Sequence, residues 1–277
     1  MSNMEELNKK ILQYANMPFI SWLLSPLAIL FVGTVLGAKK VSFQFYPFLL
    51  LYFFLLLIKA MEIAFFKHAS GDLSIPKSIP YIFYFILIMI LTLLLVATNW
   101  IVSALLVLYC CFIILAFYKE VKMEDTEYYL FLQIFFQTFI IGLISYYLQT
   151  KFISIQLLPY FLPTLFLMIP ITMNQQEKLL TSQEIKKTYS PYQDLLIEKK
   201  HFLNVISFIV GTIIIFILFN INSILIWKQI LFFSVLLIGS LPLTIKQSRN
   251  KLRLDIYIAN FVCLVTVLYS ILLNISI

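Results

Sequence analysis

Apolar residues along this chain gather into long runs that short polar stretches separate. A run of roughly 20 mostly apolar residues is long enough to cross a bilayer as a helix. The pattern predicts nine such helices, at residues of about 18–37, 44–65, 79–97, 100–118, 129–149, 156–174, 202–220, 224–244 and 255–275. We therefore expect an all-α polytopic membrane protein, with residues 1–277 forming a single nine-helix membrane domain.

Composition strengthens this prediction. The chain is 62% hydrophobic and 12% charged, with a mean hydropathy of +0.97. A soluble domain carries about 25% charged residues, so a water-soluble fold is excluded. Residues 1–17 are polar and mixed in charge, which is not the pattern of a cleavable signal, and we expect them to form a cytoplasmic segment.

The distribution of charge predicts the orientation. If the N-terminus is cytoplasmic, 16 of the 20 Lys and Arg residues fall on the cytoplasmic side. The other four are Lys39, Lys40, Lys151 and Lys228. An excess of Lys and Arg marks the cytoplasmic face of membrane proteins. We expect an N-terminus inside and a C-terminus outside, as a multi-pass protein of a cell membrane, most simply the bacterial cytoplasmic membrane.

The long polar connections at residues 59–78 and 173–201 both fall on that face, and we expect them to be cytoplasmic loops that carry any site. Glu62 and Glu177 lie where apolar runs end, and a carboxylate there is costly unless it faces a cavity or a partner. The net charge of +7 indicates lysines facing anionic membrane lipid, and we expect no nucleic-acid partner.

Three stretches of the sequence resemble a known family. They are FQTFIIGLISYYLQTKFIS, KAMEIAFFKHASGD and ITMNQQEKLLTSQEIKKT. With nine predicted helices and long connections after the second and sixth, they resemble the UbiA superfamily of intramembrane prenyltransferases. The similarity is greatest to the enzymes that prenylate 1,4-dihydroxy-2-naphthoate for menaquinone. The resemblance implies a UbiA-like helical bundle that transfers a polyprenyl group from its diphosphate to an aromatic acceptor.

The resemblance also implies a set of site residues. Two acidic motifs of the family hold Mg²⁺ on the substrate diphosphate, and hard oxygen ligands suit that ion. Carried over, Glu62 and Glu177 become the catalytic acids and principal Mg²⁺ ligands, with Asp72 and Glu184 as further metal ligands. The residues implied to contact the diphosphate are Lys67, Asn174, Lys186 and Lys187.

The sequence departs from the family pattern at several acidic positions. Phe65 and Thr181 stand where the family has Asp, and Ile185 stands where it has Gly. An alternative is therefore a degenerate member that binds a prenyl lipid or a quinone-like lipid, or that partners an active enzyme or a redox system. The sequence does not identify a protein partner. A small-molecule transporter is a third alternative, because Pro159, Pro163 and Pro170 could break the sixth helix.

Simpler interpretations of three of these acids also stand. Glu177 and Glu184 could mark the solvated face of a helix in the connection, and Glu62 could pair with Lys59 or Lys67.

Overall fold

The computed structural model describes residues 18–69, 78–118, 121, 123–182, 190–244 and 254–274. Within these residues the regular structure is helical, and no strand occurs. The longer elements are α2 (Pro18–Ala38), α3 (Phe45–Ala69), α4 (Ser78–Ala97), α5 (Trp100–Ala116), α8 (Leu158–Ser182), α9 (Pro191–Ile221), α10 (Ile226–Thr244) and α12 (Leu254–Asn274). A further rod consists of α6 (Glu127–Phe135), the π-helical turn η1 (Phe136–Ile140) and α7 (Ile141–Thr150), and a 3-10 turn, η2 (Ile155–Leu157), precedes α8.

Each of these rods coincides with one of the predicted apolar runs, so the all-helical fold is confirmed for the described residues. Five helical stretches are both long and apolar enough to cross a membrane: Phe45–His68, Glu127–Thr150, Ile155–Glu177, Pro191–Ile221 and Ile256–Asn274. Shorter apolar stretches lie in α2, α4, α5 and α10. The structure therefore supports a membrane protein, while nine crossings and the orientation remain proposals.

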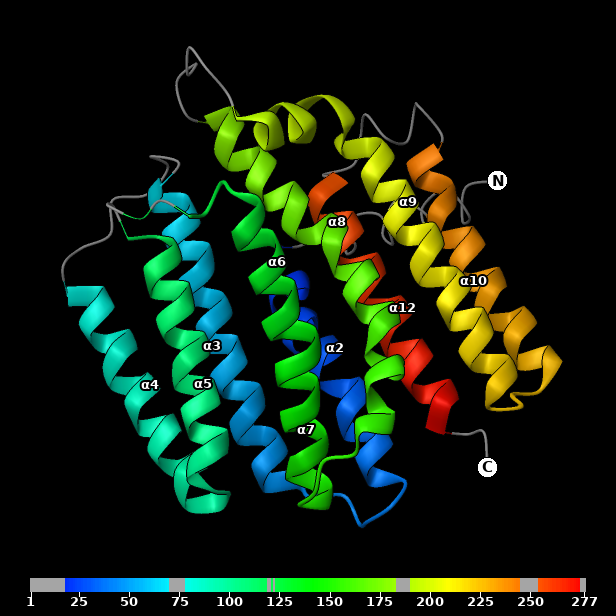
Figure 1. Ribbon diagram of the computed structural model, residues 1–277, viewed down its shortest axis with the longest axis horizontal. Coiled ribbons are helices and arrows are strands. Elements are labelled where there is room, and N and C mark those ends of the chain that lie inside the picture. The colour runs from blue at the N-terminus through cyan, green and yellow to red at the C-terminus, as the bar shows by residue number, and fades with distance from the viewer. Residues whose placement is uncertain are drawn as a thin grey trace, which may run out of the picture.

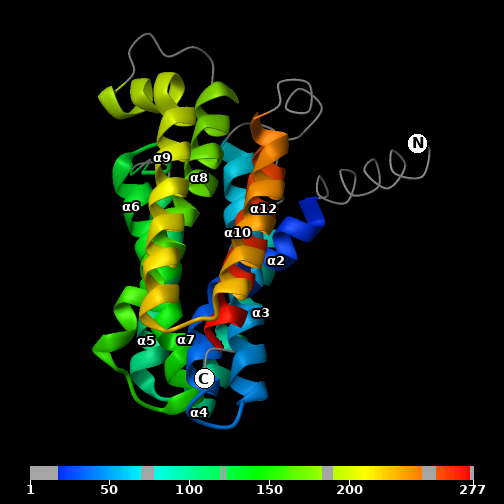
Figure 2. The same cartoon turned by 90° about the vertical axis from the view of Figure 1, so that its right-hand side faces the viewer.

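The rods lie side by side in one bundle (Figure 1). In that view α4 and α5 form one edge, α9 and α10 form the other, and the rod of α6 and α7 lies in front of α2. Figure 2 shows α8 and α9 on one side of the molecule and α10, α12 and α2 on the other. The most extensive pairings are α2 with α7, α2 with α12 and α8 with α9.

Glycines allow α2 to approach α7 closely. A Cβ atom on Gly33 would overlap Ser145 Oγ and the carbonyl oxygen of Gly142, and one on Gly37 would lie 2.6 Å from Gln149 Cβ. Lipid tails are as apolar as most side chains, so helices in a bilayer associate through such close backbone packing. This contact fixes the rod of α6 and α7 against α2.

The α3, α8 and α9 helices extend further than the sequence pattern indicated, into the connections predicted at 59–78 and 173–201, whose described residues are helical except Ser190. Lys59 and Glu62 lie inside α3, and Asn174 and Glu177 lie inside α8. At the start of α9, Ser190 Oγ accepts from the backbone N–H of Gln193, and the Gln193 side chain accepts from the N–H of Ser190. This capping box supports a polar first turn that hydropathy alone does not predict.

The prolines of α8 do not break it. Pro163 and Pro170 lie within one continuous helix, and Pro159 is in its first turn, where a missing N–H costs little. The broken helix on which the transporter alternative depended is therefore not present at this position.

Candidate functional site

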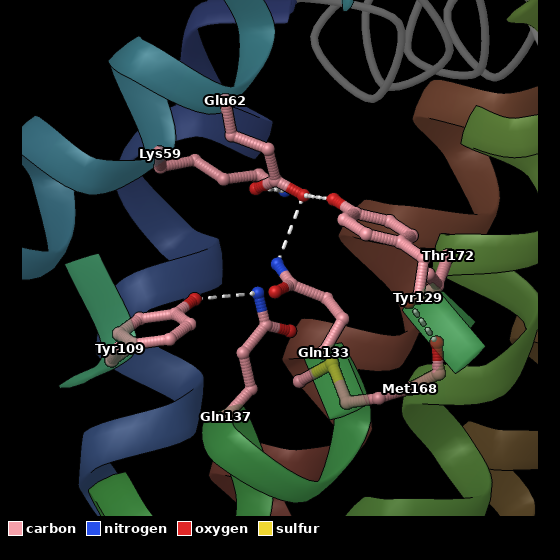
Figure 3. A network of polar contacts seen from close by, with 8 residues as sticks. All are labelled: Lys59, Glu62, Tyr109, Tyr129, Gln133, Gln137, Met168 and Thr172. Atoms are coloured by element: carbon pink, nitrogen blue, oxygen red, sulfur yellow. Dashed lines mark hydrogen bonds and ion pairs between the residues drawn. The ribbon is translucent and has the colours of Figure 1, made fainter. Parts of the chain in front are cut away.

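A buried carboxylate, Glu62, is the centre of a polar network between α3 and α6. The Lys59 ammonium donates to Glu62 Oε2 at 2.9 Å. The Tyr129 hydroxyl donates to Glu62 Oε1 at 2.8 Å, and Gln133 Nε2 donates to the same oxygen at 2.9 Å. Figure 3 shows the three side chains converging on this carboxylate from two helices. Of the two cations considered as partners of Glu62, Lys59 or Lys67, the structure shows Lys59 paired with it.

The network is almost sealed from its surroundings. Glu62 is 1% exposed, Tyr129 is 0% exposed and Gln133 is 1% exposed. A charge at such a position is expensive unless another charge and hydrogen bonds compensate it. Here one ammonium and two neutral donors occupy both carboxylate oxygens, which explains how the acid is tolerated among apolar helices.

Helical spacing brings these groups together. Lys59 and Glu62 are three residues apart on α3, and Tyr129 and Gln133 are four residues apart on α6, so each pair shares one helix face. Aromatic rings pack around them: Phe66 and Phe117 meet the Tyr129 ring edge-on, and Phe112 stacks on it at 5.8 Å. These rings exclude water from one side of the network.

A second polar pair lies beside the first. Gln137, in the π-helical turn η1, donates through Nε2 to the Tyr109 hydroxyl at 3.4 Å. Figure 3 shows this pair adjacent to Gln133. A π-helical turn contains one more residue than an α-helical turn and is frequent at functional sites. Here it begins directly after the last residue of α6.

A small cavity adjoins the two pairs. It has a volume of about 10 Å³, and its mixed lining consists of four apolar residues and of the polar residues Ser25, Lys59, Glu62, Tyr109 and Gln137. A volume of this order admits about one water molecule, which the polar groups of the lining could bind. It is too small for a diphosphate or an isoprenoid chain.

Glu177 has a different environment. It forms an ion pair with Lys200 of α9, and its side chain is 28% exposed. Its partner and its degree of burial differ from those of Glu62. The expected pairing of these two acids across one site stays a prediction.

The remaining sequence-predicted residues divide into two groups. Lys67 is exposed near the end of α3, and Asn174 is 7% exposed within α8. The structure does not describe the other four, which are Asp72, Glu184, Lys186 and Lys187.

A Mg²⁺ ion does not fit the donor set around Glu62. Mg²⁺ needs free oxygen lone pairs in octahedral geometry, whereas the Glu62 oxygens already accept from three donors, one of them a cation. Phe65, at an acidic position of the family motif, lies 5.6 Å from Phe117 between ring centroids. Among the described residues, no group of three His, Cys, Asp or Glu side chains could hold a metal ion.

The sequence analysis did not identify Tyr129, Gln133, Gln137 and Tyr109 as members of this site. A sequence pattern was available: two glutamines and a tyrosine recur at spacings of four within the apolar run YYLFLQIFFQTF. Amides at helical spacing inside a membrane helix indicate a polar face directed at protein, because lipid offers them no partners.

No family model, no curated protein and no solved structure matches this chain.

Proposed function

We propose that this protein is a membrane protein of UbiA-like architecture that binds a prenyl or quinone-like lipid without transferring the prenyl group. In this proposal the acid of the first family motif has become part of a fixed ionic core. The expectation of Mg²⁺-dependent prenyl transfer to an aromatic acceptor is the competing proposal.

One observation carries the choice between the two. Glu62, which the resemblance places at the first metal-binding acid, is saturated by Lys59, Tyr129 and Gln133. The Lys59 ammonium occupies the side of the carboxylate that a metal ion would need, and it repels a second cation. A protein that had kept diphosphate ionisation would leave this acid open to the metal.

The competing proposal has its own support in residues outside the Glu62 network. Glu177 is 28% exposed and has a Lys partner from α9, and Lys67 is exposed at the end of α3. Carboxylates and lysines of this kind can contact an anionic headgroup from the membrane surface. They do not by themselves supply the second metal cluster.

The test is a turnover assay on the full chain in lipid nanodiscs. Radiolabelled geranylgeranyl diphosphate is offered with 1,4-dihydroxy-2-naphthoate, with Mg²⁺ or with a chelator, beside an active prenyltransferase as positive control. The proposal expects no prenylated product in either condition. A Mg²⁺-dependent product that Glu177→Gln abolishes would establish the competing proposal.

A binding assay on the same preparation tests the positive part of the proposal. A photoactivatable geranylgeranyl probe should label the protein equally with Mg²⁺ and with chelator, and excess menaquinone should compete with it. Absence of competable labelling, together with absence of product, would refute both proposals.

A further inference from the structure

Two buried asparagines, one on α8 and one on α9, have unsatisfied polar atoms, and neither belongs to the Glu62 network. Within the part of the chain that the structure describes, Asn174 Nδ2 is a buried donor with no acceptor, and Asn204 Oδ1 is a buried acceptor with no donor. The two side chains are 7% and 9% exposed. Buried polar atoms nearly always have partners, and orphaned ones are costly among apolar helices.

Contacts on either side place these two residues opposite each other. Towards one end of the helix pair, Glu177 of α8 is ion-paired with Lys200 of α9. Towards the other end, a Cβ atom on Gly211 of α9 would lie 3.2 Å from Leu167 Cγ of α8. The helices run antiparallel and adjacent (Figure 1).

Helical periodicity then determines how far along its helix each asparagine lies and on which face of the helix. Asn174 follows Leu167 by seven residues, and Asn204 precedes Gly211 by seven residues. Seven residues make almost two turns, so each Asn lies on the same face as its reference residue, about 10 Å further along the axis. On antiparallel helices both displacements point the same way, which brings Asn174 and Asn204 to one level of the interface.

Their unmet hydrogen bonds are complementary. A group between them would have to accept a hydrogen bond from Asn174 Nδ2 and donate one to Asn204 Oδ1. A hydroxyl group does both, whereas a carbonyl or an ether oxygen can only accept. A cation cannot accept from the amide, and a carboxylate cannot donate to the carbonyl.

We propose that Asn174 and Asn204 form a binding site for one hydroxyl group between α8 and α9. The hydroxyl comes either from an ordered water molecule or from the headgroup of a membrane alcohol. This site uses none of the Glu62 network, so it stands or falls independently of the function proposed above.

Thermal unfolding with a defined alcohol separates the two sources. Geranylgeraniol should raise the Tm of the full chain in nanodiscs if a lipid hydroxyl occupies the site, because a ligand of the folded state stabilises it. Its methyl ether can accept but cannot donate, so it should bind about tenfold more weakly or worse. Asn174→Leu and Asn204→Leu should each abolish the shift.

A matched control is available on the same helix. Asn220 lies on α9, is exposed and donates to the carbonyl oxygen of Phe216, so Asn220→Leu should leave the alcohol response intact. If geranylgeraniol gives no shift, a high-resolution structure decides the outcome. One water between the two amides supports the proposal, and a direct Asn174–Asn204 hydrogen bond or an empty space between them overturns it.

Discussion

The Lys59 ammonium lies 2.9 Å from Glu62 Oε2, one helical turn away on α3, so this buried carboxylate has its counter-ion on the same helix. Lys59 is 11% exposed at its side chain and Glu62 is 1% exposed. A pair of this kind contributes little net stability compared with an apolar pair, but it becomes a liability when either partner is removed.

Lys59→Met should therefore destabilise the protein strongly. It leaves the Glu62 carboxylate buried without a cation, and breaking a buried pair in this way costs about 3–5 kcal/mol. The double variant Lys59→Met/Glu62→Leu should recover most of that loss. Thermal unfolding of the parent protein, Lys59→Met, Glu62→Leu and the double variant in the same detergent measures the coupling, and independent, additive losses would contradict it.

Tyr129→Phe should cost more than Tyr109→Phe, although both remove one buried phenolic hydroxyl. Tyr129 donates to a carboxylate at 2.8 Å, whereas the Tyr109 hydroxyl accepts from the Gln137 amide at 3.4 Å. A hydrogen bond to a charged group is worth about 1.5–3 kcal/mol and a neutral one about 1 kcal/mol. The free energy of unfolding of the two variants should differ in this order, and equal losses would show that the Glu62 contact has no special strength.

The Glu177–Lys200 pair should behave differently from the Glu62 network. Its side chains are 28% and 21% exposed, so water and salt screen the attraction. Glu177→Gln should change stability by less than about 1 kcal/mol, and the change should shrink as salt is added. A loss comparable to that of Lys59→Met, independent of salt, would be inconsistent with a screened pair.

Gly33→Ala should destabilise the protein, while the same substitution at Gly211 should be tolerated. The Gly33 Cβ would lie 2.2 Å from the backbone oxygen of Gly142, which cannot rotate away, whereas the Gly211 Cβ would lie 3.2 Å from Leu167 Cγ and 3.4 Å from Phe166 Cβ, distances that a small shift accommodates. Overpacking costs about 1–3 kcal/mol, and alanine regains up to about 1 kcal/mol of helix propensity. The Tm values of the two variants provide the comparison, and the prediction fails if Gly33→Ala is the more stable one.

The helices were predictable because long apolar runs have few alternatives in a bilayer. Hydropathy located the helical rods that the structure describes, but it ended two of them before Ala69 and Ser182 and began a third well after Pro191. A helix that continues past its apolar run is supported by capping and by contacts with neighbours. Gln176, for example, donates to the carbonyl oxygens of Glu124 and Thr126 and accepts from the Tyr192 hydroxyl.

The site was only partly predictable. Glu62 could be identified because an acid after an apolar run needs a partner, and Lys59 was one of the two cations within reach. Tyr129 and Gln133 come from a helix 67 and 71 residues away, and nothing in the sequence states which face of α6 meets α3. That pairing depends on three-dimensional packing, including the glycines that hold α7 against α2.

The π-helical turn at Phe136–Ile140 has a consequence for how this rod tolerates change in length. A π-helical turn takes up one more residue than an α-helical turn, so deleting one residue there would restore a regular α-helix and leave the two halves of the rod in nearly the same rotational phase. Tyr129 and Gln133 could then still face Glu62 while Gly142 and Ser145 still face α2, whereas the same deletion within α6 or α7 would turn one surface by about 100° relative to the other. The π-helical turn is thus the place in this rod where the loss of one residue disturbs its two packing surfaces least.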